Sequence, residues 1–173
     1  MTWSKPYVAH TTTARAIPNT EFVTLMVSVL QKGKHFRFCA AGFSMSPFIK
    51  DGDILTLIPA SQPHLRLGAV AAIVSPLSAK LAVHRIIACQ DDQCLFKGDN
   101  GTRPDGWVSN DDIIGVVTRV ERAGKPIRFG GGWARGLIAW LSRHNILQFG
   151  LHTSYKIYSS LFKRKTHEQR QKN

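Results

Sequence analysis

The stretch AVAAIVSPLSAKLAVHRIIA, residues 69–88, contains two short apolar segments separated by a turn that includes a proline. Segments of this length and character, bounded by turn residues, are typical of β-strands. Four further segments look alike: HFRFCA (35–40), ILTLIP (54–59), CLFK (94–97) and IIGVVTRVER (113–122). No helical periodicity lies between them. The pattern of residues 35–122 therefore predicts a mainly β body, built as a curled or barrel-like antiparallel sheet.

Helical patterns flank this β body on both sides. NTEFVTLMVSVLQKGK (19–34) has apolar residues at helical spacing, a cap at Asn19 or Thr20 and a stop at Gly33. After three consecutive glycines, residues 133–165 show apolar residues near helical spacing, which predicts one bent amphipathic helix or two. The predicted organisation is an N-terminal arm with a short helix (1–34), a β-rich core (35–122), a Gly-rich joint (123–132) and a basic helical tail (133–173).

The composition is that of one globular domain. The chain has 173 residues, of which 43% are hydrophobic and 20% charged, so it can bury a sizeable core. Its longest clean apolar run, AVAAIV, is far shorter than the roughly 20 residues that span a bilayer. The first twenty residues do not resemble a secretory signal. These features predict a cytoplasmic location, with peripheral contact to a membrane as an open alternative.

The positive charge is concentrated near the C-terminus. The net charge is +12, yet residues 1–121 carry 12 Lys and Arg against 10 Asp and Glu, while residues 122–173 carry 11 against one. Such a segment can bind anionic lipid, an acidic protein or nucleic acid, or can simply be a solvated face. We expect any membrane contact to involve residues 133–165, and we disfavour nucleic acid because no helix-turn-helix pattern precedes the β core.

The three cysteines do not form a metal-binding pattern. Cys89 and Cys94 flank QDDQ, where a hairpin turn would bring them face to face, and free thiols are the expected state in the cytosol. Cys39 is expected to be a buried strand residue. Without a CxxC pair there is no zinc framework, and we predict neither a metal nor another cofactor.

The loop GFSMSPFIKDGDIL, residues 42–55, contains the first candidate for chemistry. A serine becomes a nucleophile only when a base removes its proton and an oxyanion hole receives the developing charge. Gly42 permits close approach to the backbone, so that a substrate carbonyl can reach the Ser44 amide. Met45 can pack beneath the loop, and Pro47 stiffens the chain as it leaves the loop. A serine in such a loop is by itself most often a plain turn residue, so the interpretation depends on partners elsewhere.

Two further segments supply candidate partners. His84 lies inside the apolar strand LAVHRIIA and shares a face with Ala82 and Ile86. The loop FKGDNGTRPDGW then contains Asp99 and Asp105, and either carboxylate could orient His84 and stabilise its protonated form. Taken singly, each residue has an ordinary structural explanation as a packed histidine or a turn aspartate.

Together, the three segments give the chain a resemblance to the type I signal peptidase superfamily, which includes LexA-like self-cleaving repressors. GFSMSPFIKDGD resembles the family's Ser-x-Met-x-Pro box, which is followed by a Gly-Asp turn. VHRII resembles the second box, and FKGDN, together with a later aspartate, resembles the third. IIGVV resembles the strand that closes the family's core. The resemblance covers about residues 36–121. A histidine in the second box is similar to the endoplasmic-reticulum and archaeal type rather than the lysine type.

The resemblance implies roles for individual residues. Ser44 would be the nucleophile and His84 the general base. Asp105 is the favoured third member and Asp99 a second acidic residue of the site, although the sequence does not separate the two. Gly42 and Met45 would belong to the substrate-binding and oxyanion region. Gly42 occupies a position where the family can have a hydroxyl residue. The oxyanion hole would therefore consist mainly of backbone N–H groups, of which that of Ser44 is the first candidate.

The leading functional prediction is a serine endopeptidase that cleaves an extended segment of a precursor or partner protein, with small side chains expected beside the cut. The chain departs from signal peptidases at EFVTLMVSVL, where an anchor would precede the serine box but the apolar run is short. Two alternatives stay open. One is a catalytically silent peptide-binding module on the same fold, and the other is a LexA-like regulatory protein.

Overall fold

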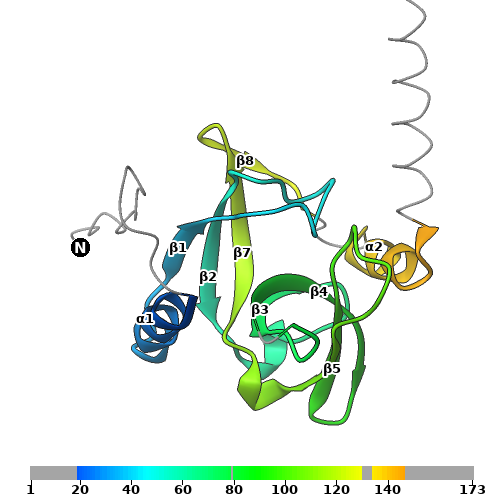
Figure 1. Ribbon diagram of the computed structural model, residues 1–173, viewed down its shortest axis with the longest axis horizontal. Helices are drawn as coiled ribbons and strands as arrows, with labels where there is room; N and C mark the ends of the chain where they lie inside the picture. The colour runs from blue at the N-terminus through cyan, green and yellow to red at the C-terminus, as the bar shows by residue number, and fades with distance from the viewer. Residues whose placement is uncertain (1–18, 79, 130–133, 147–173) are drawn as a thin grey trace, which may run out of the picture.

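A single curled antiparallel sheet forms the body of the protein, as the sequence predicted (Figure 1). The computed structural model describes residues 19–78, 80–129 and 134–146. Its strands are β1 (Phe36–Cys39), β2 (Ile54–Pro59), β3 (Val70–Val74), β4 (Leu81–Gln90), β5 (Gln93–Lys97), β6 (Gly106–Ser109), β7 (Gly115–Arg122) and β8 (Lys125–Ile127). Two single-turn helices, η1 (Gln62–His64) and η2 (Asn110–Asp112), lie in connections.

Strand β7 joins the two halves of the sheet. The strand order is β1-β2-β7-β3-β4-β5-β6, and β8 pairs with β7 outside this path. β7 pairs with β2 over residues 115–121, but its pairing with β3 comprises only Val116 with Ala71 and Gly115 with Ala72. The sheet therefore curls open beyond that short junction, which leaves one half carrying β1 and β2 and the other carrying β3 to β6.

Helix α1 (Asn19–Gln31) covers the half-sheet of β1 and β2, and it confirms the predicted N-terminal helix. Met26 and Leu30 are buried in the hydrophobic core together with residues of β1, β2 and β7. Gly33 adopts a positive φ of 70° just after the helix, and its N–H donates to the Leu30 carbonyl at 2.8 Å. This is the left-handed helix ending that glycine favours.

Helix α2 (Ala134–Arg143) packs beside β4 through buried Ile138 and Ala139. The Lys97 ammonium, at the end of β5, donates to the Ser142 carbonyl and so ties the helix to the sheet. Burial lowers the pKa of Lys97, and the charge of Asp99 opposes that shift. The helix lies in the predicted tail, whose remainder from residue 147 is outside the described residues, as is the arm up to residue 18.

The structure differs from the sequence predictions in several details. Strand β6 was not predicted, and β8 lies within the segment that we expected to be a Gly-rich joint. Cys39 is exposed, so its predicted burial is wrong, because it is the last residue of β1 and borders an open cleft. Cys89 and Cys94 do face each other across the β4–β5 hairpin, with their Sγ atoms 3.2 Å apart. Across the described ranges, none of the helices has the length and apolar character needed to cross a membrane.

Candidate active site

Ser44 lies in the loop between β1 and β2, where its side chain is exposed. The loop is held from both sides. Met45 is only 4% exposed and belongs to the hydrophobic core, and the Gly42 N–H donates to an Asp51 carboxylate oxygen at 2.8 Å. The buried Met45 side chain and the hydrogen bond from Gly42 to the Asp51 carboxylate therefore help to fix the loop around an exposed hydroxyl.

The end of this loop is anchored by Asp53, whose side chain is almost fully buried. Its carboxylate accepts hydrogen bonds from the Lys50 N–H at 2.8 Å and from two nitrogens of the Arg122 guanidinium on β7, each at 2.8 Å. Burial alone would raise the pKa of Asp53, but these hydrogen bonds and the positive charges of Arg122 and Lys50 outweigh it, so the pKa is lowered. The turn thus leads into β2 with a charged carboxylate at its base.

His84 lies on β4 and connects Ser44 to an aspartate. Its Nε2 is 3.0 Å from Ser44 Oγ, and its Nδ1 is 2.5 Å from Asp105 Oδ2. In the neutral ring, Nδ1–H donates to the carboxylate and Nε2 is left as the acceptor for the serine hydroxyl. Side chains separated by 40 and 21 residues along the chain therefore form one continuous hydrogen-bonded row.

Asp105, just before β6, is itself held in place. Its second carboxylate oxygen accepts from the buried Ser75 hydroxyl at 2.9 Å, and its N–H donates to the Phe96 carbonyl at 2.8 Å. The side chains of His84 and Asp105 are 14% and 9% exposed, so water reaches the pair only partly. This arrangement fixes the carboxylate that faces the imidazole.

The other candidate aspartate, Asp99, does not contact His84. Its two carboxylate oxygens accept from Arg85 Nε at 2.8 Å and Nη2 at 2.7 Å, and both side chains are fully buried. Arg85 also donates to the carbonyls of Gly68 and Phe129. Because successive residues of a strand point to opposite faces, His84 and its neighbour Arg85 take different aspartates on different sides of β4.

The turn after β5 approaches the Ser44 loop closely. The Asn100 N–H donates to the Ser44 carbonyl at 2.7 Å, and its side-chain amide reaches the Phe43 carbonyl at 3.3 Å. A Cβ added at Gly98 would lie 2.8 Å from the Ser44 carbonyl oxygen and 3.0 Å from His84 Nε2. Only glycine lets the two loops meet at this separation.

We expect Gly98→Ala to lower the rate of any reaction at Ser44 by at least about 10²-fold, because displacing a reacting group by roughly 1 Å costs that much. The added methyl group meets a backbone oxygen, so the serine loop or the imidazole has to move. The measurement is kcat/KM of the purified variant, with its thermal midpoint compared with that of the wild type.

Gly136→Ala is the matched control for this substitution. A Cβ at Gly136, on α2, meets nothing within 4 Å. It should leave kcat/KM unchanged and stabilise the helix by up to about 1 kcal/mol. A Gly98→Ala variant that is folded and fully active would show that the close approach has no role in positioning Ser44.

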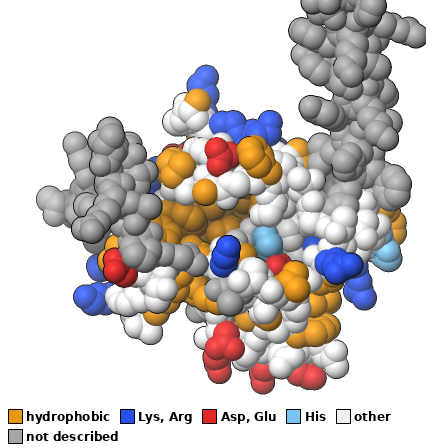
Figure 2. All heavy atoms as spheres, in the orientation of Figure 1, with side chains coloured by type: hydrophobic (Ala, Val, Ile, Leu, Met, Phe, Trp, Pro, Cys, Tyr) orange, Lys and Arg blue, Asp and Glu red, His pale blue; other side chains and the backbone are white. Residues whose placement is uncertain are grey.

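A largely apolar cleft opens beside Ser44. It has a volume of about 350 Å³ and runs between the β1 side of the loop and the start of β4. In Figure 2, hydrophobic side chains line a hollow on this face, and a histidine lies at its edge. The lining consists of Phe22, Phe38, Cys39, Ala40, Ala41, Gly42, Ser44, Met45, Ile49, Leu55, Leu81, Ala82, Val83 and His84.

The structure brings together Ser44, His84 and Asp105 among the predicted site residues, with Gly42 and Met45 in the adjoining cleft. Sequence reasoning missed Ser75, Gly98 and Asn100, which hold the aspartate and the serine loop. Gly98 and Asn100 do flank Asp99 in the FKGDN segment, so a signal existed for those two. Nothing in the sequence marked Ser75.

A hydroxyl, an imidazole and a carboxylate in this order are the groups that nucleophilic acyl transfer requires. Among the described residues, no group of three or more His, Cys, Asp or Glu side chains is arranged to hold a metal ion. Comparisons of the chain with models of known protein families, with curated proteins and with solved structures give no match.

Proposed function

We propose that this protein is a serine endopeptidase of the signal-peptidase-like type that cleaves an extended segment of a precursor or partner protein. The observation that supports it most is the row of hydrogen bonds from Ser44 through His84 to Asp105, at 3.0 Å and 2.5 Å. A serine packed for structure alone does not need an oriented imidazole backed by a fixed carboxylate.

The proposed reaction begins at Ser44 Oγ, which attacks the carbonyl carbon of the substrate while His84 Nε2 accepts the hydroxyl proton. Asp105 stabilises the imidazolium that forms. The imidazolium then gives its proton to the departing amine as the C–N bond breaks, which leaves an acyl-serine ester. Water, deprotonated by the same imidazole, hydrolyses the ester and restores Ser44.

The tetrahedral intermediate carries a negative oxygen that needs donors. Within the described part of the chain, the Ser44 N–H donates to no other group, and it lies on the exposed loop beside the cleft. We assign it as the first donor of the oxyanion hole, in line with the sequence expectation. Backbone N–H groups in such positions typically contribute a large part of the rate enhancement.

The substrate is proposed to bind as an extended strand. β4 pairs with β5 only from Arg85 onwards, whereas residues 81–84 pair with β3 alone, so the start of β4 has one open edge next to Ser44. Leu81, Ala82 and Val83 line the cleft at that edge. An added strand would use these backbone groups, while apolar side chains near the cut enter the cleft.

The test is digestion of a complex peptide pool by the purified protein, with new termini identified by mass spectrometry. Wild type should cut at sites that share apolar residues next to the scissile bond, and Ser44→Ala should give no product at any time. Ser46→Ala is the matched control, because it removes a hydroxyl from the same loop, and it should retain activity within about threefold, as expected where no contact is lost.

Either of two results would exclude the proposal. One is cleavage by Ser44→Ala at the wild-type rate, which would place the chemistry elsewhere. The other is stable binding of extended peptides by both proteins without any product, which would make the chain a peptide-binding module on this fold.

A further inference from the structure

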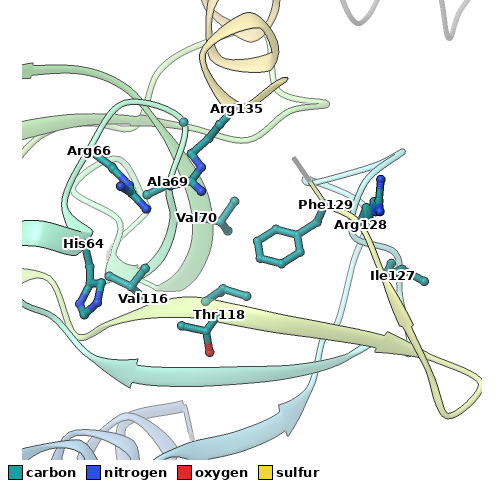
Figure 3. Close-up of a pocket in the computed structure, with 12 residues that line it drawn as sticks. His64, Arg66, Ala69, Val70, Val116, Thr118, Ile127, Arg128, Phe129 and Arg135 are labelled. Carbon is teal, nitrogen blue, oxygen red and sulfur yellow. The ribbon is translucent and has the colours of Figure 1, made fainter. Parts of the chain in front are cut away.

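A second cavity, of about 490 Å³, lies where β7 diverges from β3 (Figure 3). It is bounded by the end of η1 and the segment after it, by β3, β7 and β8, and by the first turn of α2. It shares no lining residue with the cleft beside Ser44. Its lining includes three arginines: Arg66, Arg128 and Arg135. The cavity is therefore a separate site with a strongly positive wall.

Two of these arginines face each other. Figure 3 shows the side chains of Arg66 and Arg135 converging over Ala69, whereas Arg128 points away from them. A Cβ at Gly68 would lie 2.4 Å from the Arg135 carbonyl oxygen, so the segment that carries Arg66 packs, two residues further on, directly against the backbone of Arg135. The fold holds the two guanidinium groups at the same end of the cavity.

This pair of like charges has no neutralising partner among the described residues. Ten of the eleven Asp and Glu residues lie in the described ranges, and their ion pairs go to other cations: Arg37, His84, Arg85, Arg119 and Arg122. Burial lowers the pKa of Arg135, and the charges of Arg66 and Arg85 add to this effect. An oxyanion between the two guanidinium groups would relieve their repulsion, and guanidinium is well shaped for phosphate.

Exposed apolar side chains lie beside Arg66 and on α2, the helix that carries Arg135. Leu67, beside Arg66, is 47% exposed, and Leu137 and Trp140, one turn apart on α2, are 46% and 53% exposed. Leu67 and Trp140 line a shared hollow with Arg66 and Arg143. Large apolar side chains mixed with arginines, and with a tryptophan among them, are typical of surfaces that lie at the membrane interface.

We propose that Arg66 and Arg135 bind the phosphate of an anionic phospholipid headgroup, while Leu67, Leu137 and Trp140 enter the outer part of the bilayer. The apolar side chains favour a lipid over a free phosphate, which would not use them. Arg143, which lines the same hollow as Arg66, Leu67 and Trp140, adds a further positive charge for an anionic membrane surface. The proposal does not depend on the activity of Ser44.

The experiment is flotation of the full-length protein with vesicles of phosphatidylcholine alone and of phosphatidylcholine mixed with phosphatidylglycerol. Wild type should float only with the anionic vesicles. Arg66→Gln/Arg135→Gln should bind them about 30-fold more weakly, as expected for two cations at a membrane surface. Leu137→Ala/Trp140→Ala should weaken binding by at least about tenfold through lost apolar burial. Thermal unfolding of each variant confirms that it is folded.

Lys32→Gln/Lys34→Gln is the matched control, because it removes the same charge from two exposed positions just after α1 that line neither this cavity nor the hollow beside it. Its affinity for the anionic vesicles should stay within about threefold of the wild-type affinity, which is the difference expected for general surface charge at physiological salt. An equal loss of vesicle binding in this control would show that the protein binds through non-specific electrostatic attraction and not through the proposed site. Thermal stabilisation by inorganic phosphate, with vesicle binding unaffected by Leu137→Ala/Trp140→Ala, would make the pocket a soluble-phosphate site. Absence of vesicle binding would also overturn the proposal.

Discussion

Replacing His84 with glutamine should lower kcat/KM for peptide cleavage on the order of 10⁶-fold, as loss of the base does in serine peptidases. Glutamine keeps a polar side chain on β4 but cannot accept the Ser44 proton at neutral pH. The hydroxyl, 3.0 Å from His84 Nε2, would then lose the group that activates it. The rate is measured on a peptide identified in the digestion experiment, under single-turnover conditions.

His64→Gln is the matched control for this prediction. His64 is half-buried, lies at the end of η1, and hydrogen-bonds to Ser61 rather than to the site. It should leave kcat/KM within about threefold of wild type, as is usual for substitutions away from a site. A folded His84→Gln protein that keeps more than about a tenth of the wild-type rate would contradict its role as the base, since general-base catalysis contributes at least about 10²-fold.

The second large effect separates the two aspartates. Asp99→Ala should destabilise the fold by about 3–5 kcal/mol, because it leaves the Arg85 guanidinium buried without its counter-charge. For a chain of this size, the loss corresponds to a decrease in Tm of roughly 6–20 °C. Asp105→Asn should have a much smaller effect on Tm but should lower kcat about 10⁴-fold, since it disturbs the His84 tautomer. Thermal denaturation and kinetics of the two variants are compared directly.

A further variant keeps this prediction testable if Asp99→Ala does not fold. Arg85→Met/Asp99→Leu removes both buried charges and replaces them with apolar side chains of similar size, so most of the lost stability should return. If instead Asp99→Ala melts like wild type and loses activity, then Asp99 acts in the reaction and the ion pair is not its main role.

The strands were predictable because each is a short apolar or alternating segment bounded by turn residues. The segments at 54–59 and 94–97 match β2 and the end of β5 closely. β6 and β8 were missed for a physical reason. They have four and three residues, and each is stabilised by pairing with a neighbour rather than by its own apolar pattern.

The candidate site was predictable only in part. Ser44 and His84 could be proposed from their segments, and the structure places their side chains in contact. The choice between Asp99 and Asp105 could not be made, because both lie in the same polar connection after β5. What distinguishes them is the buried Arg85, whose guanidinium pairs with Asp99 on the face of β4 opposite to His84. Such a competition between neighbours depends on tertiary packing and leaves no local pattern.

The position of β7 has a consequence for the order in which the chain can assemble. Ser44 belongs to the half of the sheet built on β1 and β2, whereas His84 and Asp105 belong to the half built on β3 to β6. The two halves are joined through β7, which is the seventh strand to be synthesised. When Ser44, His84 and Asp105 have all been synthesised, the growing chain still lacks β7, the strand that aligns the two halves. The alignment of Ser44, His84 and Asp105 therefore forms late in folding, because it rests on contacts between residues distant in sequence.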